Sequence, residues 1–298
     1  MTAGSKAAAK RKTEDLKRLI ASADWVLDNA QLDASHPTFL LNLTEQMQFY
    51  EVYTELVKMA IYNTTVQLNV RPFSRTKFYG SSATVNAWYD PQSNSITFPA
   101  AILNAPFFDA SYPKAVNYGG MGLVMGHELT HGFDDQGVQF DATGRLDDWL
   151  DAESAKGFRQ MADCIVNEYG KFCPFPPNDT SVSRHCNNGE TTQGENIADN
   201  GGARAAYYAY RSRVGSEPRL PGRMSQFTMD QLFFLSFAQV WCENVLDAEV
   251  ERRLLTDVHS SGRYRVQGTL RNFVAFADAF NCPRGSRMAP VDHCNVWI

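Results

Sequence analysis

The sequence predicts a mainly helical α+β fold with a small antiparallel sheet. Residues 5–21 have a helix-forming composition, and residues 44–60 have the pattern of a second helix. An apolar helix is expected over 228–255, because Thr228 begins a capping-box spacing in front of it. Between these helices, a small sheet is expected near residues 82–98. We therefore expect helices packed around one small sheet.

The composition limits the class of protein. With 298 residues, 44% hydrophobic and 20% charged, the chain is long enough to bury a sizeable core. A net charge of −5 argues against a nucleic-acid partner, and the short run of basic residues 10–12 is explained by the solvated face of a helix. No stretch of 18 apolar residues occurs, and no signal peptide is visible at the N-terminus.

The sheet is predicted from a hairpin. Residues 83–89 and 95–98 have strand character, and the turn-forming sequence 90–94 separates them. An exposed edge strand can pair with an extended peptide through main-chain hydrogen bonds, whatever the peptide sequence. An ordinary hairpin that only closes a small sheet remains compatible with this pattern.

The most informative segment is the string from His127 to His131, His-Glu-Leu-Thr-His. Residues four apart share one face of a helix, so these histidines could bind one cation together, with Glu128 beside them as a proton acceptor. A chain this long contains such a string by chance at roughly the one per cent level, and histidines can also lie hydrogen-bonded in a core. The apolar, small-residue stretch 119–126 and the carboxylates within 132–137 favour a site.

A third ligand is predicted in the segment 194–200. Catalytic zinc usually has three protein ligands and one open position, so two histidines alone leave the site incomplete. As part of a helix that continues to residue 208, Glu195 and Asp199 lie four residues apart on one face. Such a pair is by itself typical of a solvated helix face, but next to the histidine motif one carboxylate could bind zinc while the other holds a histidine.

Several motifs follow one another in a fixed order. They are Asn86-Ala87-Trp88-Tyr89, Phe98-Pro99-Ala100, residues 126–137, residues 194–202, residues 237–242, Asp257-Val258-His259-Ser260 and Cys294-Asn295-Val296-Trp297. In this order they resemble the catalytic half of the neprilysin and endothelin-converting-enzyme family of zinc metallopeptidases, with Trp88 a departure in aromatic type. The resemblance spans most of the chain and implies a thermolysin-like zincin fold.

The resemblance implies a role for each matching residue. His127, His131 and Glu195 would bind one Zn²⁺ per chain, and Glu128 would be the general base for the attack of a zinc-bound water on a peptide bond. Asp199 would be the carboxylate partner of the first zinc histidine, a residue also described in the family as a proton donor. His259 would stabilise the oxyanion, and Arg265 would hold the substrate backbone.

Substrate binding follows from the same match. Asn86 and Ala87 would bind the peptide backbone. An apolar pocket would receive the residue after the cleaved bond, so the expected activity is endopeptidase cleavage on the amino side of hydrophobic residues. From the sequence pattern alone, the pocket residues would be assigned to a core; they are Ile102, Phe107, Leu123, Val124, Val240 and Trp241.

Six cysteines allow 15 full pairings. The resemblance implies a bridge between Cys164 and Cys294, and we expect a local bridge between Cys173 and Cys186, which flank a proline-rich loop. In the family, the cysteines that match Cys242 and Cys282 bond to partners far upstream. Three glycosylation sequons, at Asn42, Asn63 and Asn178, agree with a secreted or cell-surface protein.

The resemblance also implies how the chain is organised. Residues 1–80 would be a helical lead-in within the family's catalytic half, and 81–298 the catalytic domain, truncated at the N-terminus relative to the family. We expect a piece of an extracellular protein, the ectodomain of a type II membrane protein or a secreted enzyme, attached to a membrane only through an upstream anchor. Its partners would be peptide substrates; the sequence does not predict the oligomeric state.

Two other functions remain open. The chain could be an inactive fragment or binding module of the same family, although an inactive relative would be free to lose Glu128, which is intact. It could also hydrolyse a substrate other than a peptide. The strand element around Asn86 argues against that possibility, because pairing with an extended main chain is specific to peptides.

Overall fold

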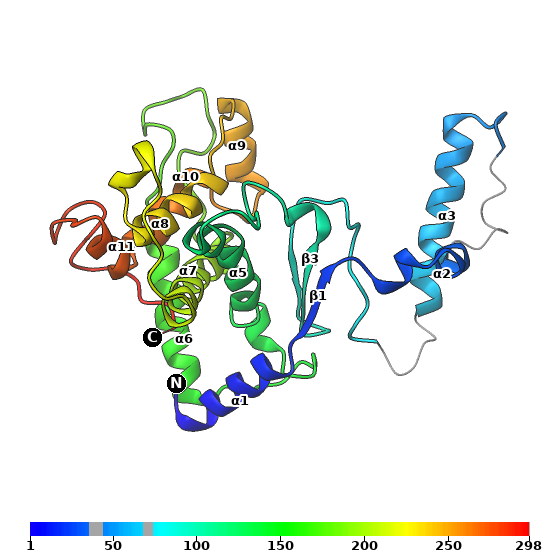
Figure 1. The fold of residues 1–298 in the computed structure, drawn as a ribbon, viewed down its shortest axis with the longest axis horizontal. Coiled ribbons are helices and arrows are strands. Elements are labelled where there is room, and N and C mark those ends of the chain that lie inside the picture. The colour runs from blue at the N-terminus through cyan, green and yellow to red at the C-terminus, as the bar shows by residue number, and fades with distance from the viewer. Residues whose placement is uncertain (36–43, 68–73, 298) are drawn as a thin grey trace.

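The computed structural model describes residues 1–35, 44–67 and 74–297. A body of helices surrounds α5 (Leu123–His131) and α7 (Gln193–Arg213), with the sheet at its side (Figure 1). Beyond the sheet stand α2 (Asn29–Ser35) and α3 (Phe49–Gln67), away from the helical body. In the described part of the chain, no helix has both the length and the apolar composition needed to cross a membrane. The sequon at Asn42 lies outside the described residues.

The sheet contains the predicted hairpin and one further strand. β2 (Trp88–Asp90) pairs antiparallel with β3 (Ser95–Pro99), which confirms the hairpin. β1 (Lys17–Ala21) pairs with the other edge of β3 in parallel, so the order is β1-β3-β2. The prediction of a purely antiparallel sheet was therefore wrong. β3 is buried along its whole length because it is the central strand.

The parallel strand also shortens the first predicted helix. α1 (Ala3–Glu14) ends seven residues before the expected boundary at residue 21. The next residues form β1, whose partners Ser95 to Pro99 lie 78 positions further along the chain. Helix-forming composition is a local property, and it loses here to the hydrogen-bonded pairing with β3, which leaves alternate residues of the segment half-buried.

Two other helices differ in their bounds. α3 begins at Phe49 rather than at 44 and continues beyond residue 60. The predicted helix over 228–255 is two helices, α8 (Met229–Val240) and α9 (Asp247–Thr256). The capping box is confirmed, since the Thr228 hydroxyl accepts from the Gln231 backbone N–H at 3.1 Å and the Gln231 side chain accepts from the Thr228 N–H at 2.9 Å.

The break after α8 has a tertiary cause. The carboxylate of Glu243 accepts a hydrogen bond from the backbone N–H of Gly262 at 2.9 Å and another from Arg253 at 2.8 Å. Gly262 is the first residue of α10 (Gly262–Arg271), so Glu243 joins the segment after α8 to a helix distant in sequence. These contacts hold residues 241–246 outside the helix, and no local pattern signals them.

The remaining helices complete three apolar clusters. α8 packs with α7 and α11 (Val274–Ala279) through Phe233, Phe234, Tyr207 and Phe273. A second cluster joins the sheet to the segment before α5, where α4 (Lys114–Asn117) and a π-helical turn, Tyr118–Gly122, lead into the helix. A third lies between α6 (Ala152–Tyr169) and α7.

Both expected disulfides are confirmed. Cys164 on α6 is bonded to Cys294 across 130 residues, and Cys173 is bonded to Cys186 within a loop. Cys242 and Cys282 are free. By loop-closure entropy, the long-range bridge contributes on the order of 4–5 kcal/mol to the free energy of unfolding.

The contact between α5 and α7 depends on glycine. A Cβ added at Gly126 would lie 2.5 Å from the carbonyl oxygen of Gly202, and one added at Gly202 would lie 2.5 Å from the backbone nitrogen of His127. No side chain fits there, so the two helices approach backbone to backbone. This close approach places the histidine face of α5 against the carboxylate face of α7.

Lys12 is buried, which corrects the expectation of a solvated basic run. Its side chain is 2% exposed and donates hydrogen bonds to the carbonyl oxygens of Gly137 and Phe140, at 2.6 and 2.7 Å. The ammonium lies within 6 Å of the rings of Tyr89, Phe133 and Trp149. α1 is thus anchored to the loop that follows α5.

The burial of Lys12 predicts a pH dependence of stability. Burial lowers its pKa from 10.5 to about 8, although Asp134 and Asp141 act in the opposite direction. Between these two pH values the unfolded chain binds more protons than the folded chain, so the free energy of unfolding contributed by Lys12 rises with pH, by up to about 3 kcal/mol. Urea unfolding at pH 7 to 10 should show this rise for the wild type relative to Lys12→Met.

The matched control is Lys10→Met on the same helix. The Lys10 side chain is 77% exposed, so its replacement should change the free energy of unfolding by about 0.5 kcal/mol or less, with the pH trend of the wild type. Parallel pH trends in wild type and Lys12→Met would contradict the assignment of a buried ammonium.

Candidate metal centre

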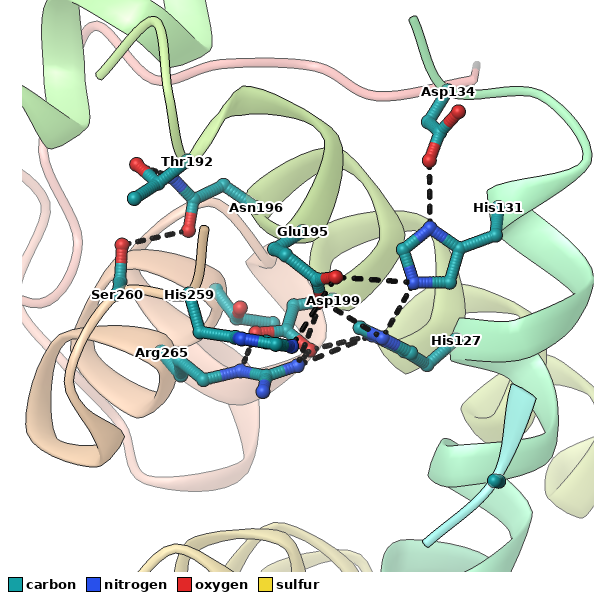
Figure 2. Close-up of polar contacts among 12 residues, drawn as sticks. His127, His131, Asp134, Thr192, Glu195, Asn196, Asp199, His259, Ser260 and Arg265 are labelled. Atoms are coloured by element: carbon teal, nitrogen blue, oxygen red, sulfur yellow. Dashed lines mark hydrogen bonds and ion pairs between the residues drawn. The ribbon is translucent and has the colours of Figure 1, made fainter. Parts of the chain in front are cut away.

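The two histidines of α5 are oriented by carboxylates from two different segments (Figure 2). His127 Nδ1 lies 2.8 Å from Asp199 Oδ1 on α7, and His131 Nδ1 lies 2.6 Å from Asp134 Oδ2 in the loop after α5. A carboxylate accepts a hydrogen bond, so each Nδ1 carries a hydrogen, and in the neutral form that binds metals each Nε2 keeps its lone pair. The two Nε2 atoms face each other at 2.9 Å.

Glu195 brings a third ligand atom to the same point. One of its carboxylate oxygens lies 3.2 Å from His127 Nε2, and the other lies 3.6 Å from His131 Nε2. Ligand atoms of the three residues all lie within 4.8 Å of one another. In the described part of the chain, the buried Oε2 of Glu195 has no hydrogen-bond partner.

This arrangement fits a metal cation. With both Nδ1 hydrogens directed at carboxylates, two imidazole lone pairs and a carboxylate converge without a hydrogen between them. Such a set is stabilised when a cation lies at its centre, and two histidines with one glutamate are ligands that zinc takes in hydrolases. The three ligands predicted from the sequence therefore lie together, on the two helices predicted to carry them.

Asp199 joins the metal centre to Arg265 on α10. Its carboxylate is fully buried and accepts two hydrogen bonds from the Arg265 guanidinium, at 2.7 and 2.8 Å, besides its contact with His127. Burial alone would raise the pKa of Asp199, but the Arg265 charge and its hydrogen bonds lower it. Trp241 stacks on Arg265, with 3.8 Å between the guanidinium carbon and the ring centroid.

Glu128 and His259 lie at the same cleft. Glu128 is 6% exposed and follows His127 on α5; its burial raises the pKa of its carboxyl group, partly offset by the two histidines. His259 Nε2 lies 3.2 Å from Glu195 Oε1, while its Nδ1 lies 2.8 Å from Asp257 Oδ1. His259 thus approaches the metal centre from a loop, with its side chain 43% exposed.

The cleft has a volume of ≈ 710 Å³, within the range of ligand sites in proteins. All the predicted ligands and catalytic groups line it. The predicted substrate-binding residues line it as well, with one exception; they are Asn86, Ala87, Ile102, Phe107, Leu123, Val124 and Trp241. The exception is Val240, which ends α8 and does not belong to the lining of this cleft.

Some lining residues were not predicted. Val85, Thr191 and Val258 also line the cleft. Each is within four residues of a predicted site residue in the sequence, and this proximity is the signal that could have indicated them. Asp134 was anticipated only as one of several carboxylates able to orient an imidazole; the structure assigns that contact to it.

Comparisons of the sequence with known proteins identify a family and several relatives. The profile of peptidase family M13 matches residues 86–296. Neprilysin-11 of Caenorhabditis elegans is 42% identical over 98% of the chain, and the endothelin-converting enzyme homolog of Locusta migratoria is 40% identical over 100%. The chain spans only 34% and 39% of the length of these two relatives.

Solved structures with the same fold are metalloproteases and a related glycoprotein. A structure described as a Haemonchus galactose containing glycoprotein complex superposes with a TM-score of 0.85 and 36% identity, over 99% of this chain and 47% of that one. Zinc metalloprotease ZMP1 of Mycobacterium tuberculosis superposes with a TM-score of 0.78 and 29% identity, over 100% and 44%. The predicted zincin-type fold, mainly helical with a small sheet, is confirmed apart from the sheet's mixed pairing.

The orienting carboxylates predict an effect on metal affinity. Both oxygens of Asp134 are used, one by His131 and the other by the backbone N–H groups of Gln136 and Gly137. An amide has only one oxygen, so Asp134→Asn should weaken zinc binding roughly 10- to 100-fold in chelator competition. Asp135→Asn, next in the sequence and in contact with neither histidine, should bind zinc as the wild type does; equal affinities in both variants would contradict the role of Asp134.

Proposed function

The chain belongs to peptidase family M13, and from that premise we propose that it is a zinc endopeptidase that cleaves oligopeptides on the amino side of hydrophobic residues. The observation that carries this proposal is the convergence of His127 Nε2, His131 Nε2 and the Glu195 carboxylate at the cleft. The relatives are longer than this chain, so its activity, substrates and specificity are part of the proposal.

His127, His131 and Glu195 would hold the zinc ion. When bound, Zn²⁺ polarises the peptide carbonyl and lowers the pKa of water towards neutrality. Asp199 and Asp134 hold the two imidazoles with Nε2 towards the centre. The ligands are thus oriented before the metal binds, and little side-chain entropy is lost on binding.

Glu128 would transfer the proton. Its carboxylate lines the cleft one residue after a ligand, on the same helix, and in the described part of the chain it contacts no arginine or lysine that would hold it in an ion pair. It accepts a proton from the attacking water and passes it to the nitrogen of the departing amine. A positioned acid–base group of this kind contributes roughly 10²- to 10⁴-fold to the rate.

His259 and Arg265 would act on the substrate oxygen and backbone. Attack on the carbonyl places negative charge on its oxygen. The ring nitrogens of His259 face two carboxylates, Nε2 that of Glu195 and Nδ1 that of Asp257; these contacts raise the pKa of His259 and favour the imidazolium, in which Nε2 is a donor at the cleft. Arg265 also lines the cleft, with its guanidinium fixed by Asp199 and Trp241. A fixed guanidinium can donate to a peptide carbonyl without first having to be ordered.

The peptide would bind along the edge of the sheet. β2 is an edge strand, and Asn86 and Ala87 precede it and line the cleft. Pairing of an extended peptide with this edge holds the main chain independently of its sequence. Specificity then depends on the apolar side of the cleft, where Ile102, Phe107, Leu123, Val124 and Trp241 would receive the side chain after the cleaved bond.

We assign the chain to an extracellular or cell-surface protein. Two disulfides are formed, and disulfides persist mainly in oxidising compartments. One relative at 39% identity is membrane metallo-endopeptidase-like 1 of Homo sapiens. The sequon at Asn178 lies in the exposed loop that the Cys173–Cys186 bridge closes, where a glycan would meet no obstacle.

A second candidate is a module that binds zinc and peptide without hydrolysis. It is favoured by large apolar side chains that α3 exposes, including Phe49 at 84% and Tyr50 at 75%. Peptide turnover by the zinc-loaded protein separates the two candidates. Zinc binding without turnover would favour the module.

Replacement of the proton acceptor is the sharpest test of the mechanism. Glu128→Gln keeps the size of the side chain but cannot accept a proton, so kcat/KM should fall roughly 10²- to 10⁴-fold while each chain still binds one zinc ion. Glu190→Gln, at an exposed position, should retain full turnover. Turnover by Glu128→Gln at the wild-type rate would eliminate the proposed role.

Specificity is tested with two peptides that differ at one position. With phenylalanine after the cleaved bond, kcat/KM should exceed that of the aspartate peptide by roughly 100-fold or more, since the apolar pocket offers no partner to a desolvated carboxylate. Equal turnover of the two peptides would reject the assigned pocket.

A further inference from the structure

A chain of buried polar side chains lies next to Glu195 and His259, and Figure 2 shows three of its members, Thr192, Asn196 and Ser260. Asn187, Thr192, Asn196 and Ser260 form it, each at most 5% exposed. Buried polar groups without partners destabilise a protein, so a satisfied network in this place fixes the segments that carry it. The proposed function does not use any of these four side chains.

Ser260 is at the centre of this network. Its hydroxyl donates to Asn196 Oδ1 at 2.9 Å and accepts from Asn187 Nδ2 at 2.7 Å. Asn196 Nδ2 donates in turn to the Thr192 hydroxyl at 2.9 Å, and that hydroxyl donates to the backbone carbonyl of Asn188 at 2.9 Å. The donor and acceptor roles are thereby assigned at each link, and the orientation of both amides is determined.

Two members of the network are sequence neighbours of site residues. Ser260 directly follows His259, and Asn196 directly follows Glu195. Apart from the contact of His259 with Glu195, the Ser260–Asn196 hydrogen bond is the polar link that joins residues 257–261 to α7 in the described part of the chain. The other partner of His259, Asp257, belongs to the same loop and therefore cannot position that loop against α7.

The position of His259 depends on this link because packing does not provide one. Its side chain is 43% exposed, whereas that of Arg265, on the neighbouring helix, is 6% exposed. A half-exposed imidazole on a loop takes its position from its own polar contacts, here with Asp257 and Glu195, and from the backbone that carries it. The buried hydroxyl of Ser260, one residue away, fixes that backbone against α7.

We propose that Ser260 is a positioning residue for His259, acting through its hydrogen bonds to Asn196 and Asn187. This inference rests on the proposed function, in which His259 donates to the oxygen that becomes negative. A displacement of that donor by about 1 Å lowers the rate on the order of 100-fold, and it does so mainly in kcat, since the donor is needed most as the charge develops.

A double-mutant cycle tests the proposal. Ser260→Ala should lower kcat roughly 10- to 100-fold with KM changed less than about threefold, and zinc affinity should stay as in the wild type. In a His259→Ala background the same replacement should lower kcat by no more than about twofold, because there is no imidazole left to position. The control is Ser225→Ala, which removes an exposed hydroxyl bonded to a neighbouring carbonyl and should leave kcat unchanged.

Two results would overturn the proposal. Equal losses from Ser260→Ala with and without His259 would show that Ser260 acts elsewhere. A loss of zinc affinity in step with kcat would show that it acts through Glu195. If Ser260→Ala does not fold, the cycle is carried out with Asn187→Ala, which removes one donor to Ser260 but keeps the bond to Asn196, and the same criteria apply with a smaller loss.

A measurement without turnover separates this inference from the proposed function. In protein with ¹⁵N-labelled histidine, the ring signals of His259 are identified by their loss in His259→Ala. Ser260→Ala should broaden or shift these signals, while Ser225→Ala should leave them unchanged. Unchanged His259 signals in Ser260→Ala would reject the positioning role, and a wild type that hydrolyses no peptide would reject the proposed function while leaving this test intact.

Discussion

The backbone contact between α5 and α7 is the constraint on which the rest of the site depends. Because neither Gly126 nor Gly202 has a side chain, the two helices lie close enough for short side chains to span them. The carboxylate oxygens of Glu195 on α7 then lie 3.2 Å from His127 Nε2 and 3.6 Å from His131 Nε2 on α5. A larger residue at Gly126 or Gly202 would push the two helices apart and move Glu195 away from the two histidines.

The same contact explains how several charged groups are buried together. Asp199 has Arg265 and His127 as partners, and Asp134 has His131 and two backbone N–H groups. The buried Asp199 carboxylate stays charged, because the Arg265 charge and its hydrogen bonds lower its pKa against the effect of burial. Glu128, next to them, forms no ion pair with such a cation in the described part of the chain, and burial raises its pKa. Neighbouring acids are therefore divided into those that hold ligands and one able to exchange a proton.

Local patterns in the sequence predicted what local geometry determines. Spacing of four residues placed His127 with His131 and Glu195 with Asp199, and the capping box marked the start of α8. The misses share a different origin. The parallel strand β1, the break after α8 at Glu243 and the burial of Lys12 all depend on partners distant in sequence. No composition or periodicity carries that information, because the same residues would be solvated without those partners.

The groups of the site are held by two different means, and this difference follows from where they lie. Helix packing positions the metal ligands on α5 and α7, whereas His259 lies on a loop and is held by polar contacts. Asn187, which donates to Ser260, directly follows Cys186 and donates its own backbone N–H to Phe172 at 2.9 Å. Phe172 and Asn187 lie directly outside the two bonded cysteines. The Cys173–Cys186 disulfide therefore keeps Asn187, the residue that donates to Ser260, close to Phe172 and limits the movement of this loop.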